Sequence, residues 1–301
     1  MTSLDLQSLR QAHQQQEKVS ADYLTQIRFL DRIDGWLQSL IDCHAFAVDC
    51  CRTKRTDYME AYAIVSSAAF SNAESTRLLL LRGFYGNALA DIRALASAAD
   101  LVADLSLTED SPSKWLRSRF IAPDDNSREA HSLRSYFKDS EIRKRIEQHQ
   151  ETPLSAALYG VASQAVHASP WGTQFFAAES LNKPGEFYVQ YSPQFHPIRA
   201  VGLASMLESS LPHLCGYFVE ACESVYKGKN HIYDDLCTRH LARLAQYKSD
   251  APKRRKLFDI IRQAQDRISA GEDMDEVFSD LRSRLRSPRE EDCTNGDANG
   301  P

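Results

Sequence analysis

Several features that would place this chain in a well-defined class are missing from its sequence. No run of 18 or more apolar residues occurs, so neither a membrane-spanning helix nor a membrane partner is expected. Residues 1–5 contain no basic stretch that leads into an apolar segment, so no secretory signal is expected and a cytoplasmic location is predicted. The formal net charge of −5 provides no overall attraction for nucleic acid, although a local basic patch stays compatible with it.

The seven cysteines lack the spacing of a metal or disulfide site. Their number is odd, no C-x-x-C pair occurs, and Cys50 and Cys51 are adjacent, which suits neither a zinc knuckle nor a simple disulfide framework. Cys215 and Cys222 are seven positions apart on an expected helix and share a face, where core packing is favoured over metal binding. Motifs such as H-E-x-x-H are also missing. We therefore expect reduced, mostly buried thiols and predict neither a metal nor a cofactor.

What the sequence does contain is helical periodicity over most of its length. Apolar residues recur every three or four positions, and the expected helices span 22–50, 58–82, 87–105, 112–120, 128–150, 153–168, 197–226, 231–247, 252–269 and 273–286. Thr56 is a predicted N-cap, and Gly83 is expected to end its helix in the left-handed conformation. We therefore predict an all-α fold, an irregular up-down helical bundle with one long loop or small β-hairpin near 171–195.

The composition divides the chain into four parts. Residues 1–21 are polar and predict a leading helix, and 22–250 form the expected helical core domain. Residues 251–287 predict charged C-terminal helices. The N-terminal helix and the 252–286 segment are both candidates for contacts with a second copy of the chain or with a partner. The tail over 288–301 has no apolar anchor, so disorder is expected there.

The strongest local basic cluster is Lys253-Arg254-Arg255-Lys256. Over 251–289 ten basic residues face seven acidic ones, which is a small surplus. Few aromatic residues are interleaved with these charges, so stacking on bases is weakly supported. Solvated helices are therefore favoured over a nucleic-acid-binding arm.

One expected helix carries a polar stripe. Its members are spaced so that they share one face of the helix: Arg93, Ser97, Asp100 and Asp104. On the preceding helix, Glu74 and Arg77 could reach the same level. One interpretation is a polar pocket that binds a ligand or a phosphate through Glu74, Arg77 and Asp100. The favoured alternative is a buried ion-pair network that fixes helix register, because such networks are commoner than binding sites.

A second polar signature ends the helix expected over 153–168. Ser163 and His167 are one turn apart, so a neutral imidazole could act as a base that Ser163, or a carboxylate from the helix of Arg93, orients. No G-x-S-x-G surrounds Ser163. Catalysis by His167 with Arg93, and ligand binding by Ser163, form the functional interpretation. The favoured alternative is a histidine that fixes the helix end.

Arg143 and His149 enclose five residues, which resembles the R-x4–6-H pattern of HEPN ribonucleases. Members of that helical family cut RNA without a metal at a dimer cleft, and the resemblance implies the same chemistry here. Lys144 stands where that family usually carries Asn, Asp or His. The surrounding residues are charged on nearly every side, so a solvated helix face is favoured.

A broader resemblance covers about 58–169. The pattern is an αα-hairpin with a glycine turn, then a small residue and an arginine, and later a helix that ends in Ser-x-x-x-His. It resembles uncharacterised bacterial helical proteins of the DUF5677-like type, domains of unknown function, through Gly86, Ala88, Arg93, Ser163 and His167. The chain departs from the pattern at Ser97, where such proteins often carry glutamate. The resemblance implies an all-helical fold and no established activity.

Two functions from different classes follow from these observations. The first is a ligand- or partner-binding module of a bacterial stress or defence system, with self-association included, because no specific catalytic motif is present. The second is a metal-independent ribonuclease or toxin of the HEPN type. Its catalytic pair would be His167 with Arg93, or alternatively Arg143 with His149.

Overall fold

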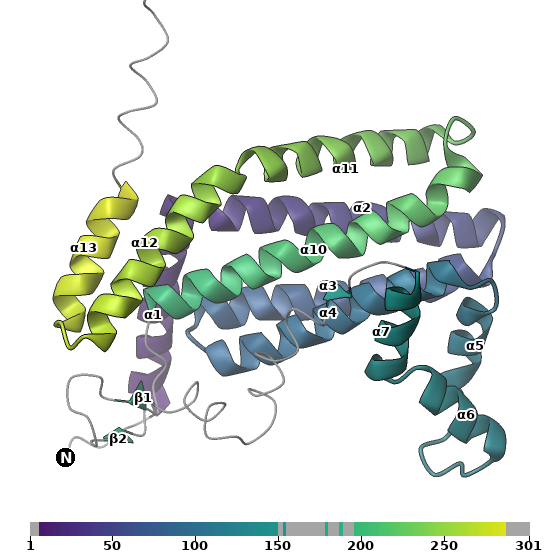
Figure 1. Ribbon diagram of the computed structural model, residues 1–301, viewed down its shortest axis with the longest axis horizontal. Coiled ribbons are helices and arrows are strands. Elements are labelled where there is room, and N and C mark those ends of the chain that lie inside the picture. The colour runs from purple at the N-terminus through teal and green to yellow at the C-terminus, as the bar shows by residue number, and fades with distance from the viewer. Residues whose placement is uncertain (1–5, 150–152, 155–177, 180–186, 189–195, 287–301) are drawn as a thin grey trace, which may run out of the picture.

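The computed structural model describes residues 6–149, 153–154, 178–179, 187–188 and 196–286, and the fold is all-α as predicted (Figure 1). One short antiparallel pair accompanies the helices, formed by β1 (Ala178–Glu179) and β2 (Phe187–Tyr188). The rest of 171–195, and the predicted disordered tail at 288–301, lie outside the described residues. Within the described part of the chain, no helix is long and apolar enough to cross a membrane.

Four long helices build the body of the molecule: α2 (Phe29–Thr53), α3 (Asp57–Leu81), α4 (Tyr85–Leu107) and α10 (Pro197–Tyr226). Helix α3 packs along α4, α4 along α10, and α10 along α2. Tyr62 and Phe218 are fully buried between these helices, with ring centroids 3.7 Å apart. Burial of such apolar surface is the main stabilising contribution to the fold.

The turn between α3 and α4 follows the sequence prediction. Gly83 has a φ of 78°, and its amide and that of Phe84 donate to carbonyls of the last turn of α3. At the other end of α3, the Thr56 side chain accepts a hydrogen bond from the Met59 amide at 3.3 Å. The alanines on the facing sides of α3 and α4 are buried, so the two backbones approach closely: Ala69, Ala73, Ala88 and Ala99.

The expected start of a helix at residue 22 is wrong. Helix α1 (Leu6–Gln26) runs past that position, and α2 begins only at Phe29. Arg28, between the two helices, has a φ of 59°, which is uncommon for a residue with a side chain. The break turns α1 back against α2 and α3, where Leu24 is fully buried, so packing outweighs the helical preference of the local sequence.

The single helix expected over 128–150 is also wrong, because the structure has two helices there. These are α6 (Arg128–Tyr136) and α7 (Asp139–Gln148). Asp139 and Glu141 lie in the first turn of α7, where negative charge favours a new helix start. The preceding short helix is α5 (Ser111–Ser118).

Three helices complete the described chain: α11 (His231–Ser249), α12 (Ala251–Ser269) and α13 (Met274–Arg286). Helix α11 lies along α2 and α10, whereas α12 and α13 form a hairpin at the end of the body opposite to α5–α7 (Figure 1). The hairpin turns at Gly271, whose φ of 91° requires a residue without a side chain.

Candidate functional site

The polar stripe on α4 forms a buried ion-pair network at its C-terminal end. Asp104 is 0% exposed, and its carboxylate accepts hydrogen bonds from Arg145 Nε at 2.5 Å and Arg145 Nη2 at 2.9 Å. Ser111 donates a further bond at 3.2 Å, and the Arg145 guanidinium stacks on Tyr136 at 3.7 Å. The network ties α7 and α5 to α4. At this end of the stripe, the structure therefore has a buried ion-pair network, the interpretation that the sequence favoured over a ligand pocket.

The other residues of the stripe also bind neighbouring segments. Asp100 is buried and accepts a hydrogen bond from the Leu154 amide at 2.7 Å, while Ser97 donates to Asp139 at 3.4 Å. Arg93 is half-buried on the same helix. The proposed partners of Arg93, Ser163 and His167, lie outside the described residues, so their catalytic and binding roles stay predictions.

Arg77 forms ion pairs with Glu74 on its own helix and with Asp34 of α2. Arg77 Nε donates to Asp34 at 2.8 Å, and Arg77 Nη1 lies 3.6 Å from Glu74. Glu74 also lines a groove of about 500 Å³ along α3, between Phe70 and Phe84. Arg77 thus links α3 to α2 at the surface, and ligand binding by Glu74 and Arg77 stays a prediction.

The alternative catalytic pair lies on one short helix. Arg143 is half-buried in α7, and His149 is the exposed residue that ends this helix. The Nδ1 atom of His149 donates to the Arg145 carbonyl at 2.8 Å, which is a structural contact within the last turn. The ribonuclease hypothesis therefore stays a prediction without support from this geometry.

A second buried ion-pair cluster was not anticipated from the sequence. Glu208 of α10 is 1% exposed and lies between two arginines, Arg32 of α2 and Arg254 of α12. Arg32 Nε donates to Glu208 at 2.7 Å, and Arg254 Nη1 lies 3.9 Å from the same carboxylate. The Arg254 guanidinium also stacks on Tyr247 at 3.7 Å. Glu208 is the only acidic residue in the mostly apolar stretch 197–219, and this isolated carboxylate was the signal in the sequence for a buried ion pair.

Among the residues that the structure describes, His196 and His240 have lowered pKa values. Desolvation, with a contribution from Arg199, lowers the pKa of His196 to about 4. The neutral ring caps α10 by accepting from the Arg199 amide at 3.3 Å, and it meets Phe278 of α13 edge-on at 5.4 Å. The His196 amide donates to Tyr85 of α4 at 3.0 Å. Burial also lowers the pKa of His240, which packs edge-on against Trp36 at 5.8 Å. Both rings are therefore neutral packing and capping groups.

The core packing predicted for Cys215 and Cys222 is confirmed. Cys43, Cys215 and Cys222 are all buried among α2, α3 and α10. A hydrogen bond with Cys43, together with burial, raises the pKa of Cys215, and burial raises that of Cys222. Among the residues that the structure describes, no group of three His, Cys, Asp or Glu side chains could hold a metal ion.

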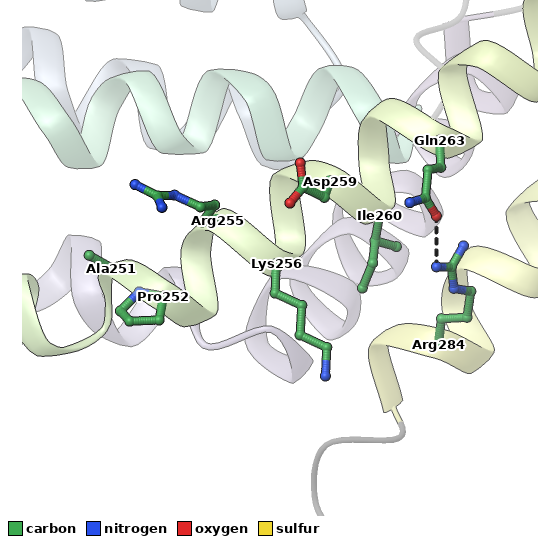
Figure 2. Close-up of a pocket in the computed structure, with 8 residues that line it drawn as sticks. All are labelled: Ala251, Pro252, Arg255, Lys256, Asp259, Ile260, Gln263 and Arg284. Carbon is green, nitrogen blue, oxygen red and sulfur yellow. Dashed lines mark hydrogen bonds between the residues drawn. The ribbon is translucent and has the colours of Figure 1, made fainter.

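A basic groove of about 670 Å³ lies on α12 and α13 (Figure 2). We use this name for the surface formed by Ala251, Pro252, Arg255, Lys256, Asp259, Ile260, Gln263 and Arg284. Its acidic member, Asp259, pairs with Arg262 at 3.0 Å, and Arg284 donates to the neutral Gln263 at 2.9 Å. Arg255 and Lys256 are exposed, and among the described residues neither has an ion-pair partner.

Comparisons of the chain with protein-family models, curated proteins and solved structures found no match. The functional assignment therefore depends on the chemistry of the described side chains. In the two buried clusters, each carboxylate is paired with arginine and joins separate helices. The basic groove differs, because it combines uncompensated positive charge with solvent access.

Proposed function

We propose that this chain is a partner-binding module and that the basic groove is its binding surface. The observation that carries the proposal is the pair Arg255 and Lys256, both exposed and both without an ion-pair partner among the described residues. In this proposal, the irregular up-down bundle predicted from the sequence is the scaffold. Arg254, the residue before this pair, anchors α12 to that scaffold through Glu208.

The lining of the groove favours an acidic polypeptide segment with apolar side chains as the partner. Ala251, Pro252 and Ile260 provide apolar surface, and Arg255, Lys256 and Arg284 provide positive charge in the lining of the groove. Figure 2 shows Arg255 and Lys256 extending to opposite sides of α12. Carboxylates of a partner would pair with the basic side chains, and its apolar side chains would cover Pro252 and Ile260. Proteins that bind a nucleic-acid backbone commonly contact more phosphates than the three basic side chains of this groove would reach, so a polypeptide partner is favoured.

Fluorescence anisotropy with a labelled synthetic peptide of alternating glutamate and leucine tests this function. The peptide is titrated into the full chain at low ionic strength, and a saturable rise is expected. The double variant Arg255→Gln, Lys256→Gln removes two charge pairs, so we expect binding at least about tenfold weaker. Added salt weakens binding to the unaltered chain in the same experiment.

A matched control removes two basic side chains elsewhere. Arg52 and Lys54 are exposed at the end of α2, so Arg52→Gln with Lys54→Gln changes the net charge equally and leaves the groove intact. This control is expected to bind the peptide as the unaltered chain does. Equal losses in both double variants would contradict the groove as the site. A labelled single-stranded oligonucleotide that binds at the groove in place of the peptide would overturn the acidic polypeptide as the partner.

A further inference from the structure

We propose that an acidic run in this same chain, Glu290-Glu291-Asp292, binds in the basic groove and competes there with the external partner. We call these three residues the acidic tail run. The inference deepens the proposed function by adding regulation of the same site. Docking of the run can be measured without any partner, so the two proposals are tested separately.

The register of the α12–α13 hairpin directs the chain toward the groove. Arg267 pairs with Asp280, and Gln263 accepts a hydrogen bond from Arg284. The two helices are therefore antiparallel, and later residues of α13 lie beside earlier residues of α12. Helix α13 ends at Arg286, two residues after Arg284, which itself lines the groove. The chain therefore leaves α13 beside the part of α12 that leads back to Lys256.

The distances allow the acidic tail run to reach the groove. Lys256 is seven residues before Gln263 on α12, which corresponds to about 10 Å along the helix axis. Glu290 is the fourth residue after Arg286 and Asp292 is the sixth. Four to six extended residues cover up to roughly 13–20 Å. The run is thus close enough in sequence to contact Arg255 and Lys256 without any movement of the hairpin.

The charges of the two segments also match. Three basic side chains of the groove have no carboxylate partner among the described residues: Arg255, Lys256 and Arg284. The acidic tail run supplies three carboxylates within three consecutive residues. Because both segments belong to one chain, the effective concentration of the run at the groove is on the order of millimolar, which favours weak ionic contacts.

Zero-length carbodiimide cross-linking of the full chain measures this contact directly. The reagent joins a carboxylate to a lysine amine that touches it, and peptide mapping by mass spectrometry identifies the pair. We expect Lys256 to be linked to the acidic tail run in the monomer fraction, and the link to disappear at high salt. Lys54, exposed directly after the end of α2, is the control amine. Equal linkage to Lys54 and Lys256, or linkage only between two chains, would overturn the proposal.

The variant Glu290→Gln, Glu291→Gln, Asp292→Asn tests the competition. With the labelled glutamate–leucine peptide, we expect this variant to bind at least about threefold more tightly than the unaltered chain, because the competing segment has lost its charge. The control triple variant removes three exposed carboxylates elsewhere and is expected to bind as the unaltered chain does: Glu109→Gln, Asp124→Asn and Asp235→Asn.

The outcomes separate the two proposals. Peptide binding that is equal in all three chains, without linkage of Lys256 to the tail, would support the binding module and overturn its regulation by the tail. Linkage without peptide binding in any chain would support the docked tail and overturn the proposed acidic partner. Equal gains in both triple variants would show a general effect of net charge and would also overturn competition at the groove.

Discussion

Arg254 and Arg255 are neighbours in the sequence, yet they lie in two very different regions of the molecule. The Arg254 side chain is only 12% exposed and reaches Glu208 in the body. Arg255 is exposed on the basic groove. Adjacent positions on a helix point about 100° apart, so one turn can serve the core and the surface together. Because Arg254 points toward the buried carboxylate of Glu208, it contributes to the fold, whereas Arg255 stays available for a partner.

The buried clusters have the same structural effect at opposite ends of the body. Asp104 ties α7 to α4 through Arg145, and Glu208 ties α12 to α2 and α10 through two arginines. A buried ion pair contributes little net stability compared with an apolar core, but removal of one partner is costly. The stability of the fold does not depend in this way on the basic side chains of the groove, since their charges are solvated. Stability and binding should therefore respond to different arginines.

The largest expected effect is that of Arg145→Ala. This change leaves Asp104 fully buried without its cationic partner, so the free energy of unfolding is expected to fall by about 3–5 kcal/mol. Urea denaturation followed by circular dichroism measures it. The control is Lys144→Ala on the same helix, because the exposed Lys144–Glu141 pair is worth less than about 1 kcal/mol. Equal losses in the two variants would contradict the role of the Asp104 cluster.

A smaller effect is expected from pH, through His196 at the junction of the hairpin and the body. Its pKa is about 4 in the folded chain, against an ordinary value of 6.5, so the unfolded chain takes up the proton first as the pH falls. Stability from the neutral ring is complete above pH 6.5 and is lost progressively toward pH 4. The pKa difference corresponds to at most about 3 kcal/mol.

Thermal unfolding at a series of pH values measures the contribution of His196. In His196→Gln, we expect the decline between pH 6.5 and 4 to become shallower than in the unaltered chain. Some decline remains, because the pKa of His240 is also lowered and acts in the same direction. Parallel pH profiles for the two chains would rule out a linkage through His196.

The sequence predicted the helical class and much of the body, because apolar residues recur there at helical spacing whichever helix they pack against. The turn at Gly83 was also predictable, since glycine is favoured in its left-handed conformation. The break at Arg28 was not, because the local residues carry no glycine or proline that signals a turn, and α1 folds back onto α2 and α3 there. Such tertiary contacts are not visible in a local pattern.

The candidate site was less predictable than the fold. Spacing alone singled out Arg143 and His149 on α7, whereas the arginine that binds Asp104 is Arg145. Arg145 lies beside Ile142 and Ile146 on the buried face of that helix, so its amphipathic pattern contained the signal. The basic cluster at 253–256 was visible in the sequence, and two of its residues line the groove. Which of its arginines pairs with Glu208 and which faces solvent depends on a contact between α12 and α10, which are distant in the chain.

The last and smallest effects separate the two neighbouring arginines. Arg254→Gln removes a charge from the Glu208 cluster, and because Arg32 still pairs with Glu208 we expect a loss of about 1–2 kcal/mol of stability. Arg255→Gln removes a solvated charge, so its effect on stability is expected to stay within about 0.5 kcal/mol. Urea denaturation of both single variants measures the difference.

Binding of the labelled glutamate–leucine peptide should reverse this order. Arg255→Gln is expected to weaken binding by about threefold, since it removes one groove charge from contact with the peptide. Arg254→Gln leaves the groove charges in place and is expected to bind within about twofold of the unaltered chain while the variant stays folded. If Arg255→Gln lowered stability as much as Arg254→Gln does, both side chains would belong to the structural cluster. The distinction between the core and the groove would then fail at α12.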